Sequence, residues 1–152
     1  MNNWLYKDKR IESIEDFPID TFGFIYCTIY LPTGQSYIGK KSLQHNVTKK
    51  LGKKELLTQP VTRGRTKLTK KITKESDWKT YYGSAIPILE LIKQGKQSDF
   101  ERKILCLATS KKLLTYFECK YLFKYEVLEQ GNLWFNNNIQ GHFFKKDFEY
   151  ED

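Results

Sequence analysis

The alternation of apolar and polar positions divides the chain into a short series of elements. Residues 22–31 are rich in Ile, Tyr and Thr, Pro32-Thr33-Gly34 is typical of a turn, and residues 35–40 resume the extended pattern, so this region predicts a β-hairpin. Residues 100–107 alternate charged and apolar side chains and then become apolar, which predicts a third strand. Before the hairpin the pattern has no clear period, and we expect only a short strand or a turn there.

Helical signals occupy the remaining segments. Ser84 is placed to cap a helix that begins at residue 86 or 87 and ends at residue 94. Ser110 caps a longer predicted helix that runs to Gln130. A further helix is predicted near residues 48–57. The order of elements favours an α+β fold, with a small, mainly antiparallel three-stranded sheet flanked by helices.

Length and composition favour one domain. A chain of 152 residues with 39% hydrophobic residues can bury a single core, so we expect one domain over residues 1–152. No apolar run approaches the length of a bilayer span, and the N-terminus lacks the apolar stretch of a signal peptide. Three widely spaced cysteines without a C-x-x-C pair are typical of reduced thiols. We therefore expect a cytoplasmic protein without membrane contact.

Positive charge is concentrated in one quarter of the sequence. The net charge is +8, but residues 40–79 alone carry 13 Lys or Arg against 3 acidic residues, and the remaining chain is slightly acidic. This basic insert, at about residues 41–77, is compatible with a solvated surface or anionic lipid, but it lacks an amphipathic Trp/Leu face. Nucleic acid is the better partner. The lysines expected to contact DNA phosphates are Lys40, Lys41, Lys49, Lys50, Lys53, Lys54, Lys67, Lys70 and Lys71.

The predicted hairpin brings two tyrosines together. If residues 32 and 33 form a two-residue turn, Tyr26 lies opposite Gly39 and Thr28 lies opposite Tyr37. Because side chains alternate along a strand, Tyr26, Thr28 and Tyr37 then share one face, with the tyrosines about 7–8 Å apart at the backbone. Two phenols beside a glycine leave room for a substrate backbone to approach. An aromatic pair that only serves the core would have the same pattern.

A carboxylate lies at the edge of the apolar stripe of the helix predicted after Ser110. At 100° per residue, Glu118 falls close to Leu114 and Tyr125. A carboxylate near a buried face is costly unless a cation, a metal ion or hydrogen bonds satisfy it. Glu118 is therefore a candidate metal ligand, and the alternative is a surface glutamate paired with a lysine.

Taken in order, these residues resemble the signature of the GIY-YIG nuclease family. Phe24-Ile25-Tyr26 and Tyr37-Ile38-Gly39 match its two halves, although Phe24 stands where the first glycine usually lies. Glu118 and Phe135-Asn136 follow in the family's order, and residues 76–84 resemble the S-D-W-x-x-Y-Y-G-S stretch of phage-encoded, homing-type members. The resemblance covers roughly residues 22–140.

The resemblance implies a metal-dependent DNA endonuclease that hydrolyses phosphodiester bonds. Tyr26 would take the proton of the attacking water, and Tyr37 would support it and contact the phosphate. Glu118 would be the single metal ligand, and Asn136 would orient the phosphate region. The family's arginine, which stabilises transition-state charge, would be Arg63 or Arg65, with Lys40 and Lys41 sharing part of the role. Oxygen-only ligation favours Mg²⁺ or Mn²⁺.

Two other functions remain open at this point. A non-catalytic nucleic-acid-binding module would keep the same fold and basic insert, and a structural protein would use the aromatic residues only as core. No second domain is apparent, so target choice would come from the insert, the loops or another protein. A single catalytic site would also need either a homodimer or two sequential nicks to cut a duplex. We expect the setting to be a phage-infected bacterial cell.

Overall fold

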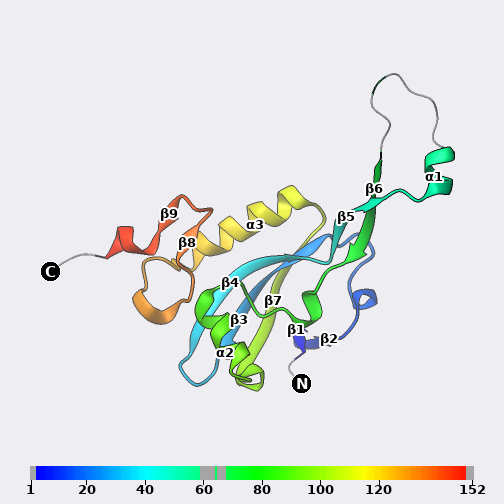
Figure 1. The fold of residues 1–152 in the computed structure, drawn as a ribbon. Coiled ribbons are helices and arrows are strands. Elements are labelled where there is room, and N and C mark those ends of the chain that lie inside the picture. Colours follow the sequence, from blue (N-terminus) through cyan, green and yellow to red (C-terminus); the bar gives the residue numbers. More distant parts are fainter. Residues whose placement is uncertain (1–2, 59–63, 65–67, 150–152) are drawn as a thin grey trace. The chain divides into compact units, whose positions relative to one another are not determined.

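The computed structural model describes residues 3–58, 64 and 68–149, and Figure 1 shows the ribbon. The chain forms two compact units. The first comprises the chain up to Leu43 and from Asp77 onward, and the second comprises Gln44–Ser76, within the segment expected as a basic insert. Among the helices of the described residues, none is both long and apolar enough to cross a membrane.

The first unit contains most of the regular structure. Its strands are β1 (Trp4–Tyr6), β2 (Lys9–Ile11), β3 (Gly23–Tyr30), β4 (Gln35–Ser42), β7 (Phe100–Ala108), β8 (Asn138–Ile139) and β9 (Phe143–Phe144). Its α-helices are α2 (Ile86–Lys93) and α3 (Lys111–Lys124). Short 3₁₀ turns cover Ile14–Asp16, Trp78–Thr80, Gln97–Asp99, Gly131–Leu133 and Lys145–Phe148.

A five-stranded sheet organises this unit, in the order β2-β1-β7-β3-β4. The three predicted strands are its β4-β3-β7 part and are antiparallel, as expected. The prediction of a three-stranded sheet was nevertheless wrong, because β1 pairs with β7 in parallel and β2 pairs with β1, which makes the sheet mixed. Each added strand has three residues, too few to show a hydrophobic period in the sequence.

Both faces of the sheet are covered, which explains why β3 is buried along most of its length. Phe24 and Tyr26 point to one face, where they pack with Trp4 and Trp78. Ile25 points to the other face, where α3 lies across the sheet. Strand β4 forms one edge of the sheet, and β2 forms the other. Residues 134–136 run along β4, since Phe135 N donates to Ser36 O at 2.7 Å.

The predicted register of the hairpin is confirmed. Tyr26 lies opposite Gly39, and Thr28 lies opposite Tyr37. The rings of Tyr26 and Tyr37 accordingly come within 6.2 Å, centroid to centroid. The turn has four residues rather than two, and Gly34 at its end has a φ of 75°, a left-handed conformation that favours glycine.

Two predicted helix boundaries differ from the structure. Ser110 does cap α3, accepting a hydrogen bond from Leu113 N at 3.1 Å, but α3 ends at Lys124 instead of Gln130. The chain turns at Glu126, where φ is 50°. The turn places the next residue, Val127, in the core beneath the helix, where it is buried. Helix α2 is not capped by Ser84: its N-cap is Ala85, and the Ser84 hydroxyl is used elsewhere.

The second unit is built on a lysine-rich hairpin. Strands β5 (Gln44–Lys50) and β6 (Thr69–Glu75) pair antiparallel, and the short helix α1 (Lys53–Leu57) follows β5. The prediction of a helix over residues 48–57 was therefore wrong for its first half. The β-branched pair Val47 and Thr48 favours a strand, and its partner is a strand about twenty residues later, which a local pattern does not reveal.

Candidate active site

A cleft of about 640 Å³ opens in the first unit, along the outer edge of the sheet. Strand β4 contributes Tyr37 and Lys40 to its wall, and α3 contributes Glu118. Because β4 is the edge strand, a side chain from one face of the sheet and a side chain from the helix on the other face can meet here. The polar residues that line the cleft include Tyr37, Lys40, Ser84, Glu118, Asn136 and Gln140.

Tyr37 presents its hydroxyl group at the cleft. Its Oη lies 2.8 Å from Ser84 Oγ, a separation that forms a hydrogen bond. Gly83 allows this approach: its φ is 139°, and a Cβ there would lie 3.1 Å from Tyr37 Cδ1. Burial raises the pKa of Tyr37, and the hydrogen bond to Ser84 opposes that rise.

Tyr26 is placed differently from Tyr37. Only 1% of it is exposed, and its ring meets the ring of Tyr81 edge to face, with centroids 5.8 Å apart. Its hydroxyl fills the space that a side chain at Gly39 would occupy, since a Cβ there would lie 2.5 Å from Tyr26 Oη. Burial is the main reason that the pKa of Tyr26 lies well above its ordinary value, so this phenol is protonated at neutral pH.

Glu118 is a half-buried carboxylate inside the cleft. It lies one helical turn from both Leu114 and Leu122, the buried residues of α3. Gln140 Nε2 donates a hydrogen bond to Glu118 Oε1 at 3.0 Å. Burial raises the pKa of Glu118, while the charge of Lys40 and the bond from Gln140 lower it. A cation next to this carboxylate would therefore be favourable.

The cleft fits a divalent cation that is held mainly by substrate and water. Across the described ranges, with their gaps at 59–63 and 65–67, no group of three or more His, Cys, Asp or Glu side chains could hold a metal ion. Magnesium is commonly bound through one or two carboxylates, with substrate phosphates and water completing its ligands. Glu118 in an open cleft matches that pattern, and it does not match a closed structural site.

Asn136 is buried against strand β4. Its Oδ1 accepts from Ile38 N at 3.0 Å, and its Nδ2 donates to Ile38 O at 2.8 Å. Only 4% of Asn136 is exposed. The amide thus extends the backbone pairing of the edge strand and fixes the position of β4 between Tyr37 and Gly39.

The two lysines after the second tyrosine have separate environments. Lys40 lines the cleft, and its Nζ donates to Thr115 Oγ1 at 3.0 Å. Lys41 forms an ion pair with Asp77 at 2.5 Å and stands over the ring of Tyr81, 4.0 Å from the centroid. Of the two, Lys40 is therefore the one available to a substrate in the cleft.

The predicted catalytic arginines, Arg63 and Arg65, lie outside the described residues, as does the predicted DNA contact Lys67. Two arginines fall within the part of the chain that the structure describes, Arg10 and Arg102, and neither lines the cleft. Lys40 is thus the cation that β4 contributes to the cleft.

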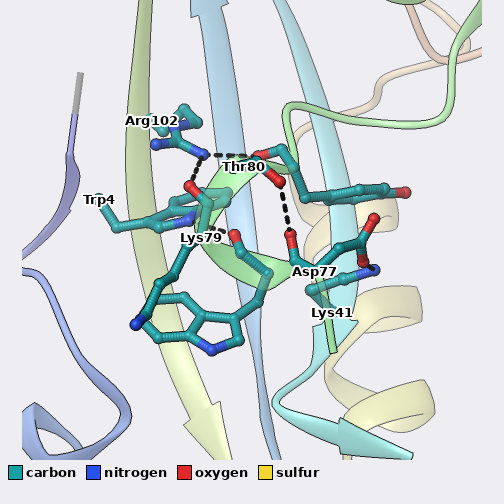
Figure 2. A network of polar contacts seen from close by, with 8 residues as sticks. Trp4, Lys41, Asp77, Lys79, Thr80 and Arg102 are labelled. Atoms are coloured by element: carbon teal, nitrogen blue, oxygen red, sulfur yellow. Dashed lines mark hydrogen bonds and ion pairs between the residues drawn. The ribbon is translucent and has the colours of Figure 1, made fainter. Parts of the chain in front are cut away.

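Arg102 holds the segment just before Ser84, and Figure 2 shows its contacts with this segment. Its Nη1 donates to Lys79 O at 2.9 Å and to Tyr81 O at 2.8 Å. The guanidinium lies between the rings of Trp4 and Tyr82, 4.5 Å and 4.2 Å from their centroids. Burial lowers the pKa of Arg102 to about 10, so the side chain stays charged at neutral pH. The charge and its two carbonyl bonds hold residues 79–82 against the sheet.

Ser84, Gln140 and Arg102 were not among the predicted site residues. Ser84 was visible in the resemblance only as part of the stretch at 76–84, where its capping potential was the stronger signal. Arg102 was visible as a charged residue within an alternating strand. Gln140 carries no local signal, because a single glutamine in a polar loop is ordinary. Each role depends on a partner at least 20 positions away.

The second unit presents the remaining predicted lysines. Lys49 and Lys70 lie directly opposite each other on β5 and β6, and Lys70 also forms an ion pair with Glu55. Like charges in direct opposition destabilise a hairpin unless a counterion lies near, and Glu55 is that counterion here. The other predicted lysines of this unit are exposed: Lys50, Lys53, Lys54 and Lys71.

The tyrosine-bearing hairpin, the third strand beside it and the helix carrying Glu118 form the arrangement expected of a GIY-YIG endonuclease domain. The model of the family described as "Putative endonuclease segE, GIY-YIG domain" matches residues 4–139. The chain therefore belongs to the GIY-YIG nuclease family. No curated protein and no solved structure matches it.

Proposed function

We propose that this protein is a DNA endonuclease that hydrolyses phosphodiester bonds in the cleft at the edge of β4, with Mg²⁺ or Mn²⁺ as cofactor. The observation that carries the proposal is the half-buried carboxylate of Glu118 in the same cleft as the Tyr37 hydroxyl and the Lys40 ammonium group. A phosphodiester repels nucleophiles by its own charge, so its hydrolysis needs positive charge and a positioned water. The cleft offers groups for both tasks.

Glu118 would hold the metal ion. A divalent cation bound there would polarise a phosphate oxygen and stabilise the leaving oxygen. Lys40 would contribute a second positive charge toward the transition state, in the role that the family gives to an arginine. The bond from Lys40 Nζ to Thr115 Oγ1 keeps the ammonium group on the α3 side of the cleft.

For the proton of the attacking water, we favour Tyr37 over Tyr26. The Tyr37 hydroxyl lines the cleft and is bonded to Ser84, whose hydroxyl can stabilise a phenolate. Tyr26, the acceptor that the resemblance implies, is packed against Gly39 and almost fully buried. Burial raises the pKa of both phenols, so Tyr37 would accept the proton only as a phenolate, which a bound metal ion and Lys40 would favour. In this assignment, Tyr26 supports strand β4 through its contact with Gly39. Asn136 fixes the backbone of the same strand through its two hydrogen bonds to Ile38.

The lysine-rich unit would bind DNA backbone phosphates. A phosphate would contact Lys49 and Lys70 together, in competition with Glu55, which is already the counterion of Lys70. Binding of this kind is insensitive to sequence and weakens as salt concentration rises. A homodimer or a further protein would then supply target choice and the second cut. The S-D-W-x-x-Y-Y-G-S stretch supports a phage origin and action in the cytoplasm of an infected bacterial cell.

Supercoiled plasmid tests the proposal directly. Purified protein, Glu118→Ala and the control Glu129→Ala, which removes an exposed carboxylate just beyond α3, are incubated with Mg²⁺ or with chelator. We expect nicking by wild type and control, and none by Glu118→Ala or in chelator. Retention of DNA on a gel without cleavage at any metal concentration would instead support the nucleic-acid-binding module. Neither cleavage nor retention would refute both functions.

A further inference from the structure

Gln140 has an unusual backbone conformation next to the cleft. Its φ is 56°, in the left-handed region that residues other than glycine, asparagine and aspartate rarely adopt. Gln140 begins the three-residue loop between β8 and β9, since Ile139 pairs with Phe143. The next residue, with a φ of 63°, is the glycine Gly141. Left-handed φ at two successive residues is typical of the short turns that close β-hairpins.

The side chain of Gln140 binds the proposed metal ligand. Its Nε2 donates to Glu118 Oε1 at 3.0 Å, across 22 positions of sequence. The loop that presents this amide is held at its start. Ile139 is buried in the core beneath α3, and Asn138 Oδ1 accepts a hydrogen bond from Gly141 N at 2.9 Å. Left-handed φ at both Gln140 and Gly141, with His142 N donating to Ile139 O at 3.0 Å, is typical of a tight hairpin turn, and this turn directs the Gln140 amide toward the carboxylate.

The hydrogen-bond donor that Glu118 uses here is the neutral amide of Gln140 and not the ammonium group of a lysine. Lysine side chains are within the same cleft, at Lys40 and Lys145, yet Lys40 is bonded to Thr115 and Lys145 to the carbonyl oxygen of Trp134. Within the described parts of the chain, no ion pair is formed by Glu118. An ion pair with a lysine would neutralise the carboxylate and compete with a metal ion. The amide of Gln140 fixes the orientation of the carboxylate without adding to the positive charge that Lys40 already brings near it.

From this geometry we propose that Gln140 is a positioning residue that orients Glu118 for a divalent cation. The inference rests on the proposed function, because it takes Glu118 as the metal ligand. Hydrogen bonds to ligating carboxylates are a common second layer of metal sites, and their loss typically weakens metal binding by about 10–100-fold. The tight turn between β8 and β9 is the element that presents the amide to Glu118.

A titration with Mg²⁺ alone, without DNA, tests the inference. Binding is followed through the NMR shifts of backbone amides around the cleft in wild type, Gln140→Gly, Gln140→Met and Glu118→Ala. Glycine adopts a φ of 56° freely and removes the amide, whereas methionine keeps the length of the side chain without its hydrogen bond. We expect both Gln140 variants to bind Mg²⁺ about tenfold more weakly or worse, and Gln140→Gly to melt no lower than wild type.

The control is Glu126→Gly, which replaces another left-handed residue, with a φ of 50°, that does not line the cleft. It should leave the Mg²⁺ affinity unchanged. If Glu118→Ala loses binding while both Gln140 variants bind like wild type, the positioning role is wrong and the metal site stands. If Glu118→Ala binds Mg²⁺ like wild type, the proposed metal ligand fails, and the role of Gln140 fails with it.

Discussion

The hydroxyl oxygens of Tyr37 and Ser84 lie 2.8 Å apart, although 47 positions separate the two residues. This contact joins the edge strand β4 to the segment between the 3₁₀ turn Trp78–Thr80 and α2. Arg102 holds the start of this segment and the turn before it, through the carbonyl oxygens of Tyr81 and Lys79. The orientation of the Tyr37 hydroxyl therefore depends on residues that are distant in the chain.

Ser84→Ala tests whether this bond matters for catalysis. Without the Ser84 hydroxyl, the pKa of Tyr37 rises further, so we expect slower single-turnover cleavage, by about tenfold, and a pH–rate profile moved to higher pH. In a Tyr37→Phe background, Ser84→Ala should cause no additional loss, because its effect acts through the phenol. Ser36→Ala, also on β4, is the control. Equal losses in both backgrounds would contradict the coupling.

Gly39→Ala should disturb the packing of Tyr26. The added Cβ would lie 2.5 Å from Tyr26 Oη and 2.7 Å from Cζ, and a buried ring cannot yield by that amount without moving its strand. Overpacking of this kind costs about 1–3 kcal/mol, which urea denaturation measures. Gly52→Ala is a suitable comparison, because nothing lies within 4 Å of its Cβ and its φ is −73°. Similar small changes in both variants would show that the close approach is not restrictive.

Asn136→Ala should destabilise the protein through the backbone of Ile38. The substitution leaves a buried N–H and a buried carbonyl group without their partners, at a cost of about 2–4 kcal/mol in the free energy of unfolding. Asn137→Ala removes an amide of the same kind from an exposed position and should change stability by less than about 0.5 kcal/mol. Equal stability of the two variants would argue that water replaces the Asn136 bonds.

Alkaline pH should destabilise the protein through Tyr26. Below the ordinary tyrosine pKa of about 10, the phenol is protonated in both folded and unfolded chains and contributes no pH dependence. Above it, the unfolded chain releases the proton first, because burial raises the pKa in the folded state, so the free energy of unfolding falls. Urea denaturation at about pH 8 and about pH 11 should show a smaller fall for Tyr26→Phe than for wild type. Tyr116→Phe, an exposed ring on α3, should show the full fall.

Sequence patterns were sufficient where the interactions are local. The register of the β3–β4 hairpin follows from the turn and from side-chain alternation, so Tyr26 and Tyr37 were placed on one face correctly. Strand β7 and the start of α3 at Ser110 were predicted for the same reason, as was the position of Glu118 beside the buried stripe of its helix. The ordered set of motifs was also enough for the family to be identified.

The tertiary structure decided everything that depends on distant partners. Strands β1 and β2 exist because β7 offers a free edge to three-residue segments, and β5 is a strand because β6 pairs with it. The sequence alone determined which chemical groups the protein has and the local elements that carry them. Only the fold decided that Tyr26 is buried behind Gly39, that Tyr37 meets Ser84, and that Gln140 holds Glu118. Hydrogen bonds and burial act through space, and short-range sequence patterns do not record them.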